Sequence, residues 1–262
     1  MGLTDEEKVA IVGAGNMAAE HARAFAAIPG VRIVGVHSRS RPRAAELAGL
    51  YGARVFDSVD ALHAGTGADV VVVAVPELAA RAVCTACFAH PWVCLLEKPV
   101  GHDLVDALAI ARAAETAGAR AFVAFNRRSH ASTRATCAAL AADPGARLIA
   151  VTDQQSMAEA RAISAPDRVV QDWMYANSIH LVDYFTHLGR GTITSVAVTS
   201  PWRPDAPGLV IATLTYDSGD IGLYQAVWNG PGPWSVTVTT ASTRSMRLVA
   251  AIYGLAEVQL PL

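Results

Sequence analysis

The start of the chain has the pattern of a buried strand, a glycine turn and a helix. The apolar run Val9–Val12 leads into a turn with Gly13 and Gly15, and an alanine-rich segment with helical spacing follows. In a GxGxx(G/A) turn the first glycine permits a tight bend, the second lets the backbone approach a pyrophosphate, and the third position, here Ala18, allows close helix–strand packing. The N–H groups of the helix N-terminus then face the phosphates. The pattern predicts dinucleotide binding; the alternative is a glycine turn without a ligand.

Short β-branched runs alternate with helical stretches through residues 1–125, which predicts a doubly wound parallel sheet of the Rossmann type. We expect strands at Val9–Val12, Arg32–Val36, Val70–Ala74, Val93–Leu96 and Ala121–Ala124. We expect helices at Met17–Ala27, Pro42–Leu50, Leu78–His90 and Leu104–Ala117. Residues 70–75 are apolar throughout, which is typical of a central strand covered on both faces.

Residues 126–262 have a different pattern, which predicts an α+β domain with a mainly antiparallel open sheet. Helices are expected near Ser129–Ala141 and Ser178–Leu188, with an irregular stretch between the first strand and the second helix. The expected strands are Leu148–Thr152, Ile193–Val198, Val210–Tyr216, Gly222–Trp228, Ser235–Thr240 and Met246–Ala250. One face of this sheet must be covered by helices or by a second subunit.

Composition narrows the classes of partner. Hydrophobic residues make up 52% of the chain and the net charge is −2, with no basic stretch interleaved with aromatics, so we expect no nucleic acid partner. The charged start Thr4–Lys8 is unlike a signal peptide, and the weakly polar stretch Ala82–Leu96 is too short for a bilayer. We expect a soluble, cytoplasmic protein without membrane contact.

The cysteines do not indicate a metal site. Cys84 and Cys87 have CxxC spacing, but they fall inside an expected helix and no second ligand pair accompanies them. We interpret these two, with Cys94 and Cys137, as small buried hydrophobic residues.

Two further segments carry candidate chemistry. Glu97, Lys98 and Pro99 follow an expected strand at the carboxyl edge of the parallel sheet, where open α/β sheets bind ligands; the alternative is a helix-start lysine beside a turn proline. His180 and Asp183 share one helical face, so the imidazole could exchange a proton with a substrate while Asp183 fixes its tautomer. The alternative is a histidine that only caps or packs its helix.

In their order these motifs resemble the glucose–fructose oxidoreductase / inositol dehydrogenase / MocA (Gfo/Idh/MocA) family. The resemblance extends over essentially the whole chain and includes Asn126–Arg128, Asp217–Gly222 and Ala226–Asn229. It implies a Rossmann domain, a mostly antiparallel open sheet that often forms a dimerisation surface, and NAD(P)-dependent oxidation or reduction of sugars and related polyols.

The resemblance also implies roles for individual residues. Lys98 matches the lysine that contacts the reacting hydroxyl or carbonyl, and His180 matches the acid/base histidine, with Asp183 as its orienting group. This is chemically reasonable because an ammonium and an imidazole stabilise the oxygen that gains charge and deliver its proton. We expect cofactor contacts from Gly13, Gly15, Asn16, Met17, Ser38, Arg39, Val75, Pro76, Glu97 and Lys98.

Two positions depart from the family pattern. Ala176 stands where the family commonly has an aspartate four residues before its histidine, and Ala80 stands where the loop that begins at Pro76 often has a histidine. These losses predict an altered proton relay, a different substrate or lost catalysis.

The end of the second strand favours NADPH over NADH. A carboxylate there would select the ribose hydroxyls of NAD, whereas this chain has Ser38 and Arg39, with Arg41 nearby. Hydroxyl and guanidinium donors suit a 2′-phosphate. The alternative is that both arginines are solvated charges at a helix start.

Polar and aromatic residues of the second half are candidates for substrate binding. The candidates are Arg127, Arg128, Gln155, Asp172, Trp173, Tyr175, Asn177 and Trp228, of which we assign Arg128, Trp173 and Asn177, together with His180, to the substrate. Trp202, Trp228 and Trp234 could instead cover the sheet against a second subunit, and we expect a homo-oligomer through this sheet.

The sequence therefore predicts an NADP-preferring oxidoreductase that acts on a secondary hydroxyl or ketone of a sugar-like or nucleotide-sugar substrate. One alternative is a reductase of the same fold that acts on an imine or another C=X bond. A second alternative is a non-catalytic sensor or partner protein that binds NADP(H) or a sugar.

Overall fold

The computed structural model describes residues 6–162, 165–230, 234–241, 245–250 and 258–259. Thr4 and Asp5 of the charged N-terminal segment lie outside this range. The chain divides into two compact units, Met1–Ala124 (unit 1) and Phe125–Leu262 (unit 2), each of which is described by itself.

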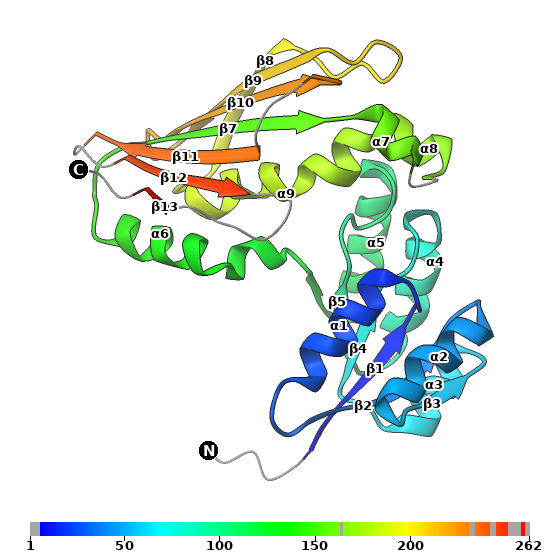
Figure 1. Cartoon of the computed structure of the whole chain (residues 1–262). Coiled ribbons are helices and arrows are strands. Elements are labelled where there is room, and N and C mark those ends of the chain that lie inside the picture. Colours follow the sequence, from blue (N-terminus) through cyan, green and yellow to red (C-terminus); the bar gives the residue numbers. More distant parts are fainter. Residues whose placement is uncertain (1–5, 163–164, 231–233, 242–244, 251–257, 260–262) are drawn as a thin grey trace. The chain divides into compact units, whose positions relative to one another are not determined.

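Unit 1 is a parallel α/β domain (Figure 1). Its strands are β1 (Glu7–Val12), β2 (Val31–His37), β3 (Arg54–Phe56), β4 (Val70–Val73), β5 (Val93–Leu96) and β6 (Arg120–Val123). Its helices are α1 (Asn16–Ala26), α2 (Arg41–Tyr51), α3 (Val59–Thr66), α4 (Glu77–Phe88) and α5 (Leu104–Ala117). The described strands lie in the order β3-β2-β1-β4-β5-β6, which confirms the predicted doubly wound sheet. The order reverses between β1 and β4, so ligands are expected beyond the carboxyl ends of these strands.

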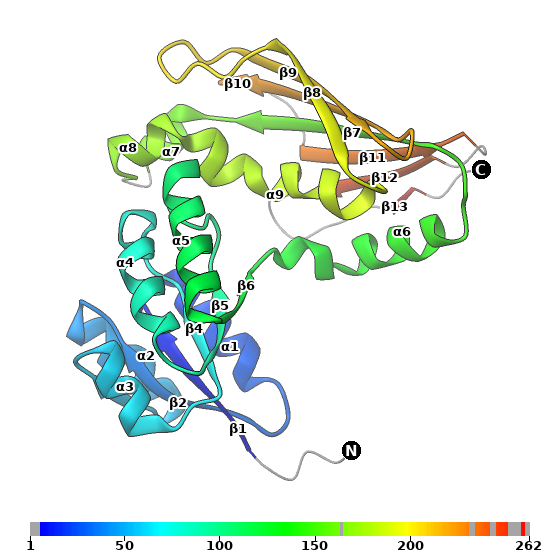
Figure 2. The same cartoon turned by 180° about the vertical axis from the view of Figure 1, so that it is seen from behind.

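Helices cover both faces of this sheet (Figure 2). Ala18 and Leu47 of α1 and α2 pack on one face, and Leu62, Cys84 and Ile110 of α3, α4 and α5 pack on the other. Neither β3 nor α3 was expected from the sequence, because a three-residue strand and an eight-residue helix leave little periodicity.

Unit 2 contains a mixed sheet. Its strands are β7 (Arg147–Gln155), β8 (Ile193–Ser200), β9 (Leu209–Tyr216), β10 (Ile221–Trp228), β11 (Trp234–Thr240), β12 (Ser245–Ala250) and β13 (Val258–Gln259). Its helical segments are the 3₁₀ turn η1 (Asn126–Ser129), α6 (Ala131–Ala141), α7 (Met157–Ala162), α8 (Asp167–Gln171) and α9 (Trp173–Leu188). The described strands lie in the order β13-β12-β11-β7-β10-β9-β8, in which β7 and β10 run parallel and the other neighbours antiparallel.

The second half of the chain is more helical than its sequence predicted. Helices α7 and α8 occupy the stretch expected to be irregular, and α9 begins at Trp173, five residues before the expected Ser178. The first turns of α9 hold Trp173, Tyr175 and Asn177, which are weak helix formers, so tertiary packing sets this boundary.

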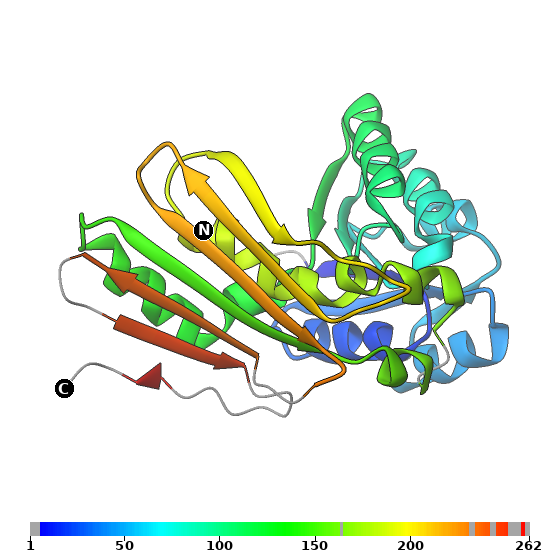
Figure 3. The same cartoon turned by 90° about the horizontal axis from the view of Figure 1, so that it is seen from above.

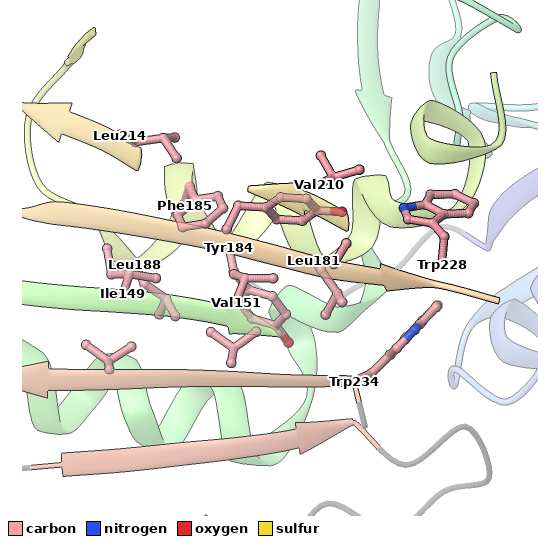
Figure 4. Close-up of a cluster of buried hydrophobic side chains, with 14 of the residues drawn as sticks. Ile149, Val151, Leu181, Tyr184, Phe185, Leu188, Val210, Leu214, Trp228 and Trp234 are labelled. Carbon is pink, nitrogen blue, oxygen red and sulfur yellow. The ribbon is translucent and has the colours of Figure 1, made fainter. Parts of the chain in front are cut away.

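Helices α6 and α9 lie against one face of the unit 2 sheet (Figure 3). Alternate residues of the strands point to this side and form the core with Leu181 and Phe185 of α9 (Figure 4). Trp228 and Trp234 belong to this buried core, so the expectation that they cover the sheet against a second subunit is wrong. We call the other side, with Leu148, Ala150, Ile211, Ile221, Leu223 and Val227, the open face, because no helix within the described part of unit 2 covers it.

A buried carboxylate fixes the hairpin between β9 and β10. Gly219, in the loop Asp217–Asp220, has a φ of 84°. Both oxygens of Asp220 accept hydrogen bonds, from the backbone N–H groups of Arg147 and Arg190 at 2.9 Å each and from the Arg190 guanidinium at 2.6 and 3.1 Å. Burial alone would raise the pKa of Asp220, but these hydrogen bonds outweigh it and hold the pKa below its ordinary value.

We expect Asp220→Asn to lower the free energy of unfolding by about 3 kcal/mol at pH 7, because it leaves Arg190 without its anion. A depressed carboxyl pKa stabilises the fold above the unfolded-state pKa, and this contribution is lost as pH falls through the folded-state pKa. The difference between variant and wild type should therefore narrow below about pH 4. Urea unfolding at pH 7 and pH 3 measures this, with exposed Asp205→Asn as control. A variant as stable as wild type at pH 7 would contradict it.

Candidate functional site

The turn after β1 requires glycine at its first position. Gly13 has a φ of 121°, and its N–H donates to the carbonyl of His37 at 2.8 Å. A Cβ on Gly13 would collide with the backbone carbonyl of Ala74, just beyond β4. The turn therefore lies directly against the end of the neighbouring strand, which no side chain would allow.

The second glycine of the turn is not required by the fold. Gly15 has a φ of −93°, and a Cβ there would meet no atom within 4 Å. It is the N-cap of α1 but supplies no capping side chain, and Asn16 and Met17 beyond it are exposed. The open space beside the uncapped N–H groups of α1 suits the phosphates of a dinucleotide. A side chain on residue 15 would fill that space.

The two arginines after β2 differ in their surroundings. Arg41 forms an ion pair with Asp57. Arg39 is exposed and has no hydrogen bond or ion pair within the described residues, and half-buried Ser38 accepts a hydrogen bond from the Ser40 N–H at 3.3 Å. Arg39 is thus the guanidinium at this strand end that no carboxylate holds.

Lys98 lies at the same sheet edge as the glycine turn. It follows β5, and the Glu97 N–H still pairs with the carbonyl of Val73 on β4 at 2.8 Å. The Glu97 carboxylate accepts from the Lys98 backbone N–H at 3.0 Å, and the peptide bond before buried Pro99 is cis. Val75 and Pro76 follow β4, so these candidate cofactor residues gather at the carboxyl ends of neighbouring strands of unit 1.

A histidine that no sequence motif singled out also belongs to this edge. His21 of α1 places its Nε2 atom 2.7 Å from Oε2 of Glu97. The two side chains are only 15% and 12% exposed. They lie 76 positions apart, so no local pattern could have indicated the pair.

Helix α9 of unit 2 carries His180 and Asp183. Both oxygens of Asp183 accept hydrogen bonds from the Arg128 guanidinium, at 2.7 and 2.5 Å. This pair joins η1 to α9, and the bonds to Asp183 raise the pKa of Arg128. Arg128, selected as a substrate contact, thus holds the carboxylate that lies one turn beyond His180.

A buried chain of hydrogen bonds ends at Asn177. Asp153 is fully buried and accepts from the Tyr224 hydroxyl at 2.7 Å and from Nε2 of Gln155 at 2.8 Å. The Gln155 oxygen then accepts from Nδ2 of Asn177 at 2.8 Å. Burial, and then the charge of Asp153, raise the pKa of Tyr224, so its hydroxyl keeps its proton and donates.

The direction of this chain follows from its anchor. A carboxylate only accepts, so Gln155 must donate its NH₂ to Asp153 and offer its oxygen to Asn177. Asn177 must then donate, and its Oδ1 atom accepts from no protein group within the described residues. The sequence identified Gln155 and Asn177 but not Asp153 and Tyr224, which orient them.

Trp173 is half-buried at the start of α9 and packs against the unit 2 core. Ala176 is 3% exposed and Ala80 is 7% exposed, so neither position presents a side chain that could replace the family's acid or imidazole.

Three of the four cysteines lie in the unit 1 core, as expected. Burial raises the pKa of Cys84 to about 12 and that of Cys94 to about 11, and it also raises that of Cys87. Such thiols stay protonated and are poor metal ligands. Cys137 is half-buried in unit 2.

Within the described part of the chain, no three or more His, Cys, Asp or Glu side chains are grouped to hold a metal ion. No helix in that part combines the length and apolarity that crossing a membrane requires.

Comparisons with known proteins agree with these features. Residues 7–125 match the model of the GFO_IDH_MocA family, described as an oxidoreductase family with an NAD-binding Rossmann fold. An inositol 2-dehydrogenase of Streptomyces avermitilis is 37% identical over 123 residues, which cover 46% of this chain and 36% of that enzyme. The chain spans about a third of the length of the curated relatives that it first matches.

Solved structures extend the similarity of fold to both units. The WlbA dehydrogenase of Bordetella pertussis, in complex with NADH and UDP-GlcNAcA, superposes with a TM-score of 0.77 at 20% identity, over 98% of this chain and 78% of that chain. A structure described as a putative myo-inositol dehydrogenase of Sinorhizobium meliloti superposes with a TM-score of 0.75 at 20% identity, over 92% and 75%. The family model and the curated relatives place the Rossmann part of this chain, residues 7–125, in the Gfo/Idh/MocA oxidoreductase family, and the solved structures share the fold of both units.

Proposed function

We propose that the protein transfers a hydride between a nicotinamide cofactor, preferably NADP(H), and a secondary hydroxyl or ketone of a sugar-like substrate. The observation that carries this proposal is the meeting of two features at one edge of unit 1. The open, uncapped N-terminus of α1 follows β1, and Lys98 follows β5, with only β4 between these strands. A cofactor whose phosphates bind at the α1 N-terminus would bring its nicotinamide close to the Lys98 ammonium.

In this proposal the chain supplies charge and protons. When bound, NADP(H) provides or accepts the hydride. The Lys98 ammonium stabilises the substrate oxygen as it gains negative charge, and Lys98 and His180 form the acid/base pair that exchanges the proton on that oxygen. Asp183 lies one helical turn beyond His180, where Arg128 fixes its position.

Residue usage supports a specific role for Lys98. The chain has 21 lysines and arginines, and only Lys8 and Lys98 are lysines. A surface cation is replaceable by arginine, whereas a compact ammonium that gives up a proton is not. A lysine kept at the sheet edge in so arginine-rich a chain therefore supports proton transfer there.

The orientation of Asn177 supports a hydroxylated substrate. Its Oδ1 atom is an acceptor that no group within the described residues occupies, so it suits a substrate that presents O–H or N–H donors rather than another acceptor. Sugars, polyols and nucleotide-sugars have such donors. Inositol, for which one related dehydrogenase is named, and UDP-GlcNAcA, which is bound in a structure of another, belong to the same class of compound.

A second candidate function is a non-catalytic sensor that binds NADP(H) or a sugar. The absence of an acid at Ala176 and of an imidazole at Ala80 favours it. Lys98 favours the enzyme, because a binder needs no proton donor beside the nicotinamide.

The proposal includes a homo-oligomer in the cytoplasm. The apolar open face of the unit 2 sheet supports association between copies, since Leu148, Ile221 and Val227 are at least 37% exposed there. Sedimentation at increasing concentration would measure the assembly.

We expect Lys98→Met to lower kcat at least about 100-fold, because the substrate oxygen loses its stabilising cation. The Kd for NADPH should stay within about threefold, since the phosphates bind at α1 instead. Steady-state assays at 340 nm and fluorescence titration measure the two quantities, with Lys8→Met as the matched control. If the Lys98 variant keeps most of its kcat, the assignment is wrong.

We expect the wild type to prefer NADPH, and Arg39→Ala to weaken NADPH binding about tenfold by removing one charge-assisted hydrogen bond to the 2′-phosphate. NADH binding should be unchanged. Arg41→Ala should have a smaller effect, because Asp57 already pairs with Arg41. Fluorescence titration of both cofactors decides this; a tenfold preference of the wild type for NADH would refute the proposal.

We expect Gly15→Val to weaken binding of either cofactor at least about tenfold, because its side chain fills the space above the α1 N-terminus. The melting temperature should fall by only a few degrees, since no protein atom lies there. Calorimetric titration and thermal unfolding test this, with Gly49→Ala as a second glycine that faces open space. Unchanged cofactor affinity in the folded variant would show that the turn binds no phosphate.

A further inference from the structure

The pair formed by His21 and Glu97 connects two functional elements of unit 1. His21 lies on α1, the helix whose N-terminus is the candidate phosphate site, and Glu97 directly precedes Lys98. A carboxylate only accepts, so Nε2 of His21 carries the proton of their 2.7 Å hydrogen bond. The tautomer of His21 at this atom is therefore fixed by Glu97.

The second oxygen of Glu97 continues this connection. Oε1 accepts from the backbone N–H of Lys98 at 3.0 Å, while Oε2 accepts from His21. Two donors from different elements thus hold one carboxylate, and both side chains of the pair are at least 85% buried. The charged neighbours of His21 on its own helix, Glu20 and Arg23, pair with each other in solvent at 2.7 Å.

We infer that His21 is a positioning residue for Lys98. Through Glu97 it fixes the backbone from which the Lys98 side chain starts, relative to the helix that takes the cofactor phosphates. The consequence for the reaction rests on the proposed function: an ammonium displaced by about 1 Å from the reacting oxygen loses much of its effect on rate. A histidine that only packs α1 against the sheet would not act on Lys98 in this way.

The lysine content of the chain allows a direct test in the whole protein. Reductive ¹³C-methylation labels lysines and keeps their charge, and Lys8 and Lys98 are the two lysines present. Lys8→Arg assigns the Lys98 NMR signal. The comparison includes His21→Leu, His21→Gln, which places an amide donor near Nε2, and Glu20→Gln as a control on the same helix. His21→Asn, whose donor is too short to reach Glu97, replaces His21→Leu if that variant does not fold.

We expect His21→Leu to shift the Lys98 signal and lower kcat about tenfold, with the Kd for NADPH within threefold of wild type. His21→Gln and Glu20→Gln should resemble wild type in all three measurements. The inference is overturned if the Lys98 signal does not move in His21→Leu, if NADPH affinity falls in step with kcat, or if His21→Gln fails to rescue. If the wild type turns over no substrate, the proposed function fails, but the NMR comparison still decides the role of His21.

Discussion

A close backbone approach between the turn after β1 and the end of β4 determines the geometry of the candidate cofactor site. Gly13 allows this approach because its positive φ and missing Cβ leave room for the carbonyl of Ala74. The chain then enters α1 with its first N–H groups uncapped at the sheet edge. Because β4 and β5 end at the same edge, the approach also brings Val75, Pro76 and Lys98 to the region that the cofactor would occupy.

Charge partners within each unit further define the candidate site. Asp183 was selected from the sequence for its place on the helical face of His180, and Arg41 for its place after the second strand. Each is paired with a residue that the sequence did not connect to it. The pair between Arg128 and Asp183 fixes η1 on α9, and the pair between Arg41 and Asp57 leaves Arg39 as the guanidinium open to a phosphate. Glu97 accepts a hydrogen bond from His21, and this bond holds the strand end from which Lys98 follows.

The features that the sequence predicted well are those with a local pattern. The strand Val9–Val12 is followed directly by its glycine turn, and the apolar run 70–75 is followed directly by α4. Each of these patterns lies within a few neighbouring residues, so the parallel sheet could be predicted. The hydrogen bond between Asp153 and Tyr224 joins residues 71 positions apart, and that between His21 and Glu97 spans 76. Such contacts arise only when strands and helices pack, and α7, α8 and the early start of α9 likewise depend on packing rather than on propensity.

The central claim is hydride transfer to a hydroxylated carbonyl substrate, and isotope transfer tests it most directly. The protein would be incubated with NADPH that carries deuterium at both C4 positions of the nicotinamide, together with keto forms of inositol, hexoses and a UDP-sugar. The mass of each product would then be measured by mass spectrometry. The account predicts one deuterium on the carbon that was the carbonyl in at least one product, and incorporation at least about 100-fold slower with Lys98→Met. Tight NADPH binding without deuterium in any product would contradict the account and favour a sensor.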